Sequence, residues 1–374
     1  MTGLAHLALS DFRSYADLAL PVDAPLIALA GENGAGKTNI LEAISLLSPG
    51  RGLRRAEFAD MARSGAGGGF AVSVRLADDT QIGLGLGEPD ETGRRIRNQR
   101  INGAPSSSLN AVSEHVRVVW LTPEQDGLFR GSAGDRRRFL DRLVLAIDAE
   151  HGARVTALER ALRDRNRILD ERPHDAGWLD AIERQVAELG VAVAAARAEA
   201  VTRLGALIEE TRDDTSPFPW AMLALEGELD RLVAALAAVD AEDAYQALLK
   251  QNRPRDKAAG RTLIGAQATD LKVRHGPKDI AAEQGSTGEQ KALLVGLVLA
   301  HARLVAAMSR LAPIVLMDEI AAHFDPRRRT ALYEALGELG CQVWMTGADE
   351  GLFRDLPAGS ARLVVTPGRA DRLA

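Results

Sequence analysis

The sequence has a single cysteine and no excess of basic residues, and each shortage excludes a class of protein. Cys341 lies in the apolar run "CQVWM" and has no second thiol for an internal disulfide, which fits a reducing compartment and a structural role in the core. The net charge of −6 argues against a protein that coats nucleic acid indiscriminately. Basic groupings at 93–100, 135–142 and 325–330 leave local basic surfaces open, although each could equally be a solvated face.

Long hydrophobic runs are also absent. The sequence reaches Asp11 and Arg13 before any long apolar segment, so we expect no secretory signal. The most apolar stretch, 292–300, is too short to span a bilayer. We therefore expect a cytoplasmic protein that has no membrane partner. With 374 residues, the chain is long enough for two domains or for one large domain with an insertion.

The residue pattern changes twice along the chain. The first hundred residues alternate β-like runs with turns, and a hairpin is expected near Asn102 and Gly103. From 136 to 211 the apolar spacing is helical, and it predicts two helices of about 30 residues (roughly 45 Å) on either side of "DERPHDAGW". Strand and helix patterns return at "GRTLIGAQATDLKVRHG". We expect an α/β body, residues 1–126 and 259–374, interrupted by a mainly helical arm, residues 127–258.

The segment "GENGAGKT", Gly31 to Thr38, matches the phosphate-loop pattern G-x-x-x-x-G-K-[ST]. The apolar run "LIALA" precedes it and the amphipathic "NILEAISLL" follows it, which is the strand-loop-helix context that such a loop requires. Glycines let the backbone amides surround phosphates, Lys37 reaches the β- and γ-phosphates, and the hydroxyl of Thr38 ligates magnesium. The sequence therefore predicts a nucleotide site that uses Mg²⁺.

The segment "IVLMDEI", residues 314–320, is an apolar strand that ends in two carboxylates. Asp318 can hold magnesium directly or through water, and Glu319 can polarise an attacking water as a general base. The alternative is a strand-end salt bridge or cap. Together with a phosphate loop, the pair favours hydrolysis, because a small-molecule kinase has less need of the second carboxylate.

A second anion-binding feature lies in "EQGSTGEQKALLVGLVLA", residues 283–300. Ser286, Thr287 and Gly288 come at the expected start of an apolar helix, where free amides and the positive dipole end suit an anion. An ordinary N-cap is the alternative, because Ser and Thr caps are common.

The order of phosphate loop, glycine-containing helix start and Asp-Glu strand resembles the ATP-binding-cassette arrangement, with "STGEQ" at the signature position. Longer segments resemble successive blocks of the RecF family, cassette ATPases of bacterial recombinational repair related to SMC heads. These are "LALSDFRSY", "GENGAGKTNILEAISLLSPGRGLR", "TPEQDGLFRGSAGDRRRFLD", "GRTLIGA", "QGSTGEQKALLVGLVLA" and "IVLMDEIAAHFD". The resemblance spans nearly the whole chain and implies an α/β fold, a cassette-type P-loop ATPase head with an inserted helical arm.

Carried over residue by residue, the resemblance implies ATP contacts, a signature that acts across a homodimer, a D-loop and a Q-loop. The implied residues are Arg13, Gly31, Glu32, Asn33, Gly34, Ala35, Gly36, Lys37, Thr38 and Asn39 for ATP; Ser286, Thr287, Gly288 and Gln290 for the signature; Asp325 for the D-loop; and Thr38, Asp318 and Gln125 for the metal, with Glu124 as the alternative to Gln125. The sequence departs from the family in two places. "GAQATDL" replaces a usual Pro-His-Arg run, and "WMTGAD" offers Thr346 but no histidine at the switch, so γ-phosphate sensing is weak or made by Thr346 and turnover should be slow.

By resemblance, ATP drives dimerisation on duplex DNA near a single-stranded gap, and the protein helps RecO and RecR to load RecA. Expected DNA contacts are the phosphate-directed side chains of Arg94, Arg95, Arg97 and Arg100, whose binding should weaken with salt. Slow hydrolysis through Glu319 would then open the dimer and release DNA, which makes the protein a weak DNA-linked ATPase. The main alternative is the nucleotide-binding subunit of a membrane transporter, which salt-sensitive duplex binding would distinguish. A nuclease with a cassette head would need a further metal-carboxylate domain, and we do not expect one in the roughly 50 residues after "MDE".

Overall fold

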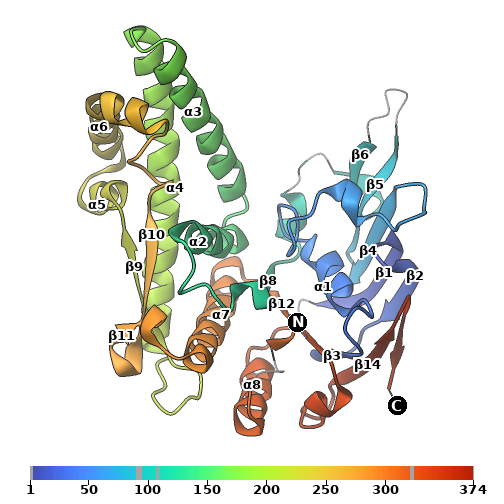
Figure 1. Ribbon diagram of the computed structural model, residues 1–374. Helices are drawn as coiled ribbons and strands as arrows, with labels where there is room; N and C mark the ends of the chain where they lie inside the picture. The colour runs from blue at the N-terminus through green and yellow to red at the C-terminus, as the bar shows by residue number, and fades with distance from the viewer. Residues whose placement is uncertain (1–2, 90–94, 107, 109, 321–323, 374) are drawn as a thin grey trace. The chain divides into compact units, whose positions relative to one another are not determined.

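The computed structural model describes residues 3–89, 95–106, 108, 110–320 and 324–373. It contains two compact units. Unit 1 comprises residues 1–126, 215–218 and 287–374, and unit 2 comprises residues 127–214 and 219–286. Figure 1 labels their helices and strands.

The first sheet of unit 1 is antiparallel. Its strands follow the order β2-β1-β4-β5-β6-β7, with β1 (Leu4–Phe12), β2 (Tyr15–Pro21), β4 (Phe70–Leu76), β5 (Gln81–Pro89), β6 (Arg95–Ile101) and β7 (Ala104–Pro105). Strand β4 buries alternate residues, as expected for a sheet with one face on a core. The expected hairpin is confirmed, because Ile101 pairs with Ala104 and both Asn102 and Gly103 have the positive φ angles of a tight primed turn.

The second sheet of unit 1 contains the nucleotide-site strands. Its order is β15-β14-β3-β13-β12-β8, with β3 (Leu26–Ala30), β8 (Val118–Leu121), β12 (Ile314–Met317), β13 (Val343–Gly347), β14 (Ala361–Thr366) and β15 (Arg369–Arg372). All neighbours are parallel except β14 and β15. Both faces of β3 are buried, which explains its unbroken apolar sequence. Strand β13 lies between β3 and β12, so the segments that follow these three strands meet at one edge.

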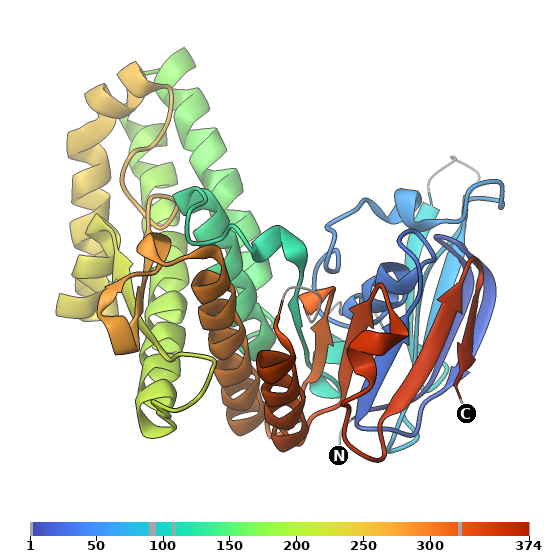
Figure 2. The same ribbon diagram turned by 60° about the horizontal axis from the view of Figure 1, so that its bottom comes forward.

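The α-helices that the structure describes in unit 1 are α1 (Lys37–Ser45), α7 (Thr287–Ser309) and α8 (Pro326–Glu338). Helix α1 contacts β1 of the antiparallel sheet and β8 and β13 of the parallel sheet. One continuous apolar core includes residues of both sheets and of α1, and Figure 2 shows β14 and β15 alongside the antiparallel strands. The phosphate loop is therefore anchored at both of its ends in one core.

Helix α7 corrects one expectation from the sequence. At 23 residues and with high mean hydropathy, it is long and apolar enough to cross a membrane, although 292–300 alone is not. However, 67% of its most apolar window is buried inside the structure, as in the core helix of a soluble protein. Burial, and not shortness, is thus the feature that argues against a membrane span.

Unit 2 consists of helices that pack around α4, together with a small sheet of order β11-β10-β9. The elements are α2 (Ala133–Ile147), α3 (His151–Glu171), α4 (Ala176–Glu210), β9 (Ala221–Glu226), α5 (Glu228–Ala235), α6 (Ala238–Ala259), β10 (Asp270–His275) and β11 (Ile280–Ala281). The expected pair of 30-residue helices is wrong, because the first is divided into α2 and α3. The chain is extended at Asp148, whose Oδ1 accepts a hydrogen bond from the backbone N–H of Glu150 at 3.0 Å.

The second junction between the units also differs from the expected one. Residues 259–286 belong to unit 2, whereas the sequence pattern placed the return to the ATPase head at residue 259. Strand β10 pairs with β9 from Asp270↔Glu226 to His275↔Ala221, and this pairing holds the segment in unit 2. The turn before it is tied to α6, because Asp256 Oδ1 accepts a hydrogen bond from the backbone N–H of Leu263.

A buried arginine joins three helices of unit 2. Arg165 of α3 is fully buried, and its guanidinium donates to Glu183 Oε1 of α4 at 3.1 Å and to Asp256 Oδ2 of α6 at 2.8 Å. It also donates to Thr262 Oγ1 at 2.7 Å and to the carbonyl oxygen of Leu249 at 2.9 Å. Every hydrogen-bonded partner of this cation is thus on a different segment from α3, so the network fixes how the helices pack.

Candidate nucleotide site

The phosphate loop follows β3 and ends in the first turn of α1. Gly31 and Gly36 both have positive φ angles, 157° and 112°. A Cβ atom on Gly31 would lie 2.3 Å from the carbonyl oxygen of Val365, and one on Gly36 would lie 2.8 Å from the hydroxyl oxygen of Tyr15. Both positions therefore require glycine, and Gly36 directs the amides of the α1 N-terminus into the loop.

Lys37 lies within the loop that it is expected to serve. Its Nζ donates to the carbonyl oxygens of Gly31 at 2.6 Å and Glu32 at 2.8 Å. Burial lowers the pKa of Lys37, while the carboxylates of Glu319 and Asp318 act in the opposite direction. The ammonium therefore belongs to the same electrostatic cluster as the two acidic residues after β12.

Two hydroxyls, the carboxylate of Asp318 and the backbone N–H of Glu319 meet where β12 and β13 end beside α1. Asp318 Oδ1 accepts hydrogen bonds from Thr38 Oγ1 at 3.0 Å and from Thr346 Oγ1 at 2.7 Å. The hydroxyl of Thr346 also accepts the backbone N–H of Glu319 at 2.8 Å. Glu319 has φ 52°, a left-handed conformation that is uncommon for glutamate and typical of functional sites. The three segments thus hold Glu319 in a defined position next to the loop.

Thr346 was one of two expected explanations of γ-phosphate sensing, and its hydroxyl is engaged within its own chain. It is fully buried, and its hydroxyl is occupied by both acidic residues, so it holds Asp318 and the backbone of Glu319. Its only sequence signal was its place after an apolar strand, which carries no information on the direction of the side chain.

The oxygen set at this point fits Mg²⁺. Mg²⁺ usually takes one or two protein oxygens and fills its remaining positions with water and phosphate oxygens. Thr38 and Asp318 present such a pair, whereas no cluster of three His, Cys, Asp or Glu ligands occurs in the part of the chain that the structure describes. Gln125 has a different partner here, because its Oε1 accepts the backbone N–H of Thr122 at 3.0 Å and caps a short helical turn.

Arg13 contacts a helix and not the loop itself. Its Nε and Nη2 atoms donate to the fully buried carboxylate of Glu42 in α1, and its Nη1 donates to the carbonyl oxygen of Asp60. Arg54 pairs with the same carboxylate at 3.2 Å and donates to Asn39 Oδ1 at 2.8 Å, while Asn39 Nδ2 donates to Ser14 Oγ. Arg13 and Asn39 therefore stabilise the start of α1 through side-chain hydrogen bonds. Glu42 was not predicted from the sequence, because nothing in the amphipathic pattern of the helix indicates that its carboxylate is buried.

The start of α7 is presented as expected, with one exception. Ser286, Thr287 and Gly288 are exposed at its first turn. Gln290, by contrast, is only 3% exposed in the single chain, and its contact with a second subunit stays a prediction. Asp325 is exposed and caps α8 by accepting the backbone N–H of Arg328 at 3.0 Å.

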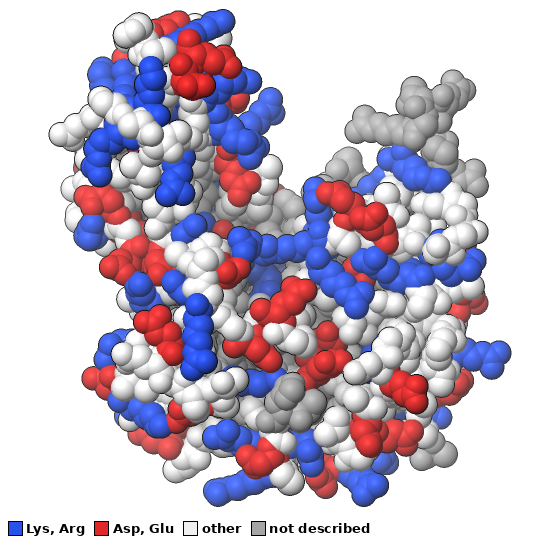
Figure 3. Space-filling model, in the orientation of Figure 1, with Lys and Arg blue, Asp and Glu red and all other residues white. Residues whose placement is uncertain are grey.

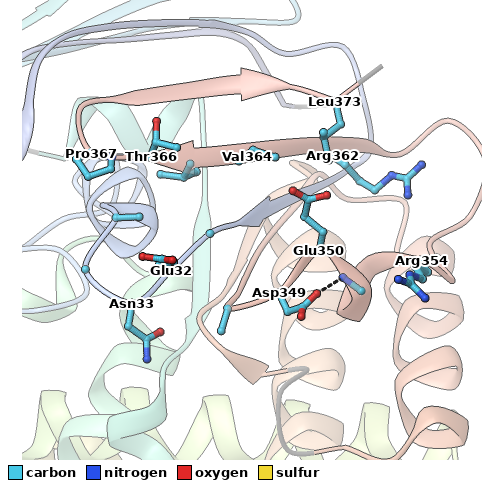
Figure 4. A pocket seen from close by; sticks show the side chains of 16 residues that line it. Glu32, Asn33, Asp349, Glu350, Arg354, Arg362, Val364, Thr366, Pro367 and Leu373 are labelled. Carbon is cyan, nitrogen blue, oxygen red and sulfur yellow. Dashed lines mark hydrogen bonds between the residues drawn. The ribbon is translucent and has the colours of Figure 1, made fainter.

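A cavity of about 790 Å³ lies beside the loop, against the outer face of β14. Figure 4 shows Glu32 and Asn33 on one side of it and Val364, Thr366 and Pro367 on another. Lys37, Thr38 and Asp318 are not among its lining residues. The cavity therefore adjoins the loop backbone, whereas the side chains of Lys37, Thr38 and Asp318 lie outside its lining.

The arginines of β6 do not form one face. Arg94 lies outside the described residues. Arg97 is half-buried over the ring of Phe58, 4.3 Å from its centroid, and burial lowers its pKa. Arg95 donates to the carbonyl oxygens of Gly67 and Gly87, whereas Arg100 is exposed on the opposite face of the strand. Figure 3 shows both basic and acidic side chains on the visible surface.

Comparison with known proteins gives concordant matches over nearly the full chain. The family model "RecF/RecN/SMC N terminal domain" matches residues 3–365. The chain is 53% identical to the "DNA replication and repair protein RecF" of Mesorhizobium japonicum, over 98% of this chain and 97% of the relative. It is 51% identical to the protein of the same name from Rhizobium meliloti, over 98% of both.

Solved structures agree in fold. The structure entitled "Structure of the recombination mediator protein RecF-ATPrS in RecFOR pathway" superimposes with a TM-score of 0.86 at 20% identity, covering 100% of this chain and 98% of that one. An Smc head domain from Pyrococcus furiosus, bound to the C-terminal domain of ScpA, superimposes with a TM-score of 0.54 at 17% identity, covering 100% and 96%. The expected fold class, a cassette-type ATPase head with an inserted helical arm, is confirmed.

Proposed function

The chain belongs to the RecF family within the RecF/RecN/SMC proteins, and from this premise we propose that it is a slow, DNA-linked ATPase of recombinational repair. It binds ATP, dimerises on duplex DNA near single-stranded gaps, and assists RecO and RecR in loading RecA. It acts in the cytoplasm. The observation that carries the proposal is the convergence of Thr38, Asp318, Thr346 and Glu319 beside the phosphate loop.

The loop binds the phosphates of ATP, and the acidic pair supplies a metal ligand and a general base. The amides at the start of α1 and the Nζ of Lys37 bind the β- and γ-phosphates. To do so, Lys37 replaces its hydrogen bonds to the loop carbonyls by bonds to phosphate oxygens. Mg²⁺, when held by Thr38 and Asp318, offsets the charge on these phosphates. Glu319 accepts the proton of the attacking water, and its fixed backbone keeps the carboxylate on the loop side of the strand end.

The exposed start of α7 supports a coupling between ATP binding and dimerisation. Its free amides and the hydroxyl of Ser286 would meet the γ-phosphate of ATP held by a second copy, so two nucleotides join two subunits. Hydrolysis removes the bridging phosphate, and the dimer then opens. On DNA, exposed basic side chains such as Arg100 contact phosphates and position the dimer without reading sequence.

Thr346→Val should slow ATP hydrolysis by about tenfold to a hundredfold. The change keeps the volume of the side chain but removes two buried hydrogen bonds, each worth about 1–1.5 kcal/mol, and tenfold in rate corresponds to about 1.4 kcal/mol. ATP affinity should change little, because Thr346 does not line the loop. Thr346→Ser retains the hydroxyl and serves as the control. Equal turnover in the valine variant and wild type would show that these bonds do not position the acidic pair.

Ser286→Arg should abolish the effect of ATP on DNA binding. Anisotropy of labelled gapped duplex is measured with and without ATP and Mg²⁺, and wild type is expected to bind more tightly with ATP. An arginine at the start of α7 blocks the approach of a second subunit, so the variant should bind equally weakly with or without ATP. Ser64→Arg adds the same charge at an exposed turn and is the control.

Binding that is indifferent both to ATP and to Ser286→Arg would refute the clamp mechanism. If wild type fails to bind gapped duplex under any condition, the DNA function itself is wrong and the transporter alternative gains weight.

A further inference from the structure

Unit 2 contains a basic cavity that the nucleotide chemistry does not use. Its volume is about 330 Å³, and it lies among α2, α3 and the loop 261–268. Arg137 and Arg261 line it, together with Asn166, and no carboxylate is among its lining residues. A partly enclosed site with cationic and amide donors and no acidic group has the composition of an anion site.

Arg137 differs from the arginines on either side of it. Arg136 forms an ion pair with Asp270 at 2.7 Å, and Arg138 pairs with Asp135. Within the described residues Arg137 forms no ion pair, and its guanidinium has one hydrogen bond, from Nη1 to the carbonyl oxygen of Thr269 at 2.8 Å. Burial and then the charge of Arg197 lower its pKa, although Asp270 and Asp141 partly oppose this. A half-buried cation without a contacting counter-charge is stabilised by an anion.

Asn166 and Arg261 offer further donors in the wall of the cavity. Asn166 Oδ1 accepts a hydrogen bond from the hydroxyl of Thr262, and this hydroxyl accepts one from the buried Arg165. The Nδ2 group of Asn166 is therefore the part of the amide that can donate to a ligand. Arg261 is exposed, and over the ranges that the structure describes its side chain forms no hydrogen bond or ion pair. Gln267, by contrast, directs its Nε2 to the carbonyl oxygens of Thr262 and Ile264.

We propose that this cavity binds a phosphate group through Arg137, Arg261 and Asn166. Guanidinium groups match the geometry of phosphate oxygens, and the small volume suits one phosphate with part of its ester rather than a whole nucleotide. The source of the phosphate is DNA, an assignment that rests on the proposed function. A free phosphate ester presents the same chemistry.

Arg261→Gln and Arg137→Gln each test the DNA source. Affinity for gapped duplex is measured by anisotropy at several salt concentrations, with Arg138→Gln as the matched control on the same helix. Each test variant should bind about tenfold more weakly, and the slope of log K against log salt should fall by about one. ATP affinity should be unchanged. Arg261→Gln cannot act through misfolding, because its exposed side chain has no partner within the described residues.

A second measurement tests the free anion. In full-length Lys37→Ala, in which the phosphate loop is disabled, inorganic phosphate should raise the melting temperature, and adding Arg261→Gln should remove this rise. If the variants bind gapped duplex more weakly, the site binds nucleic acid. If DNA affinity is unchanged and only the phosphate-induced rise in melting temperature is lost, the site binds a small phosphate ester. If neither variant differs from Arg138→Gln and phosphate has no effect on the melting temperature, the proposal is overturned. If wild type does not bind duplex at all, the proposed function fails, and the phosphate measurement still decides this site.

Discussion

Glu319→Gln is expected to reduce ATP hydrolysis by about 10²–10⁴-fold, the usual contribution of a positioned general base. Glutamine has nearly the same shape and tolerates the same backbone conformation, so the hydrogen bond from the backbone N–H at residue 319 to Thr346 should survive. ATP binding should be retained, and the ATP-bound dimer should remain on DNA longer because the bridging phosphate is not removed.

The measurement is phosphate release in a single turnover, with nucleotide binding followed separately. Glu350→Gln is the control, since this exposed carboxylate lines the neighbouring cavity and takes no part in the chemistry. Turnover of Glu319→Gln at the rate of wild type would assign the proton transfer to another group and would leave Glu319 with a structural role only.

Arg165→Met is expected to lower the free energy of unfolding of unit 2 by about 3–5 kcal/mol. Removal of one member of a buried ion pair leaves the others charged and without a partner, which costs this amount in comparable cases. Here two carboxylates, Glu183 and Asp256, lose the guanidinium at once, although Arg253 still contacts Glu183. Methionine fills part of the space, so the effect comes from charge more than from a cavity.

Thermal and urea unfolding measure the loss, and limited proteolysis locates it in unit 2. Arg163→Met, on an exposed position of the same helix, should leave stability within about 0.5 kcal/mol of wild type. Because Arg165 also holds Thr262, the variant should lose phosphate binding at the cavity of unit 2. Unchanged unfolding in Arg165→Met would mean that water or neighbouring groups replace the guanidinium.

The nucleotide site was predictable because its signals are local. Gly36 and Lys37 are recognisable within eight residues, and the buried strand before Asp318 identifies the acidic pair without any knowledge of the fold. The parallel register then brings them together, since residues after neighbouring parallel strands share an edge. The roles of Arg13 and Thr346 were not predictable, because each depends on the direction of one side chain toward a distant segment.

The boundaries of the arm along the sequence depend on the pairing of strands that are far apart in the chain. Strand β10 joins unit 2 through β9, and helical periodicity between them gives no sign of this. The burial of Arg97 also depends on a distant residue and could not be predicted from the local sequence. Alternation in "RIRNQRI" indicates that Arg97 and Arg100 face opposite sides, but only the position of Phe58 decides which side is covered.

The connectivity of unit 1 has a consequence for the order of folding during synthesis. Strand β3, which carries the phosphate loop, pairs on both sides with strands near the other end of the sequence: Leu26 with Val343, and Ile27 with Ala361. While the chain emerges from the ribosome, both edges of β3 therefore stay unpaired until almost all of the sequence has been translated. Unit 2 is made earlier, and its main contacts lie within 127–286, so it can fold first. Nascent unit 1 should thus be the part of this protein that most requires chaperones, and translation pauses after residue 286 should increase its aggregation.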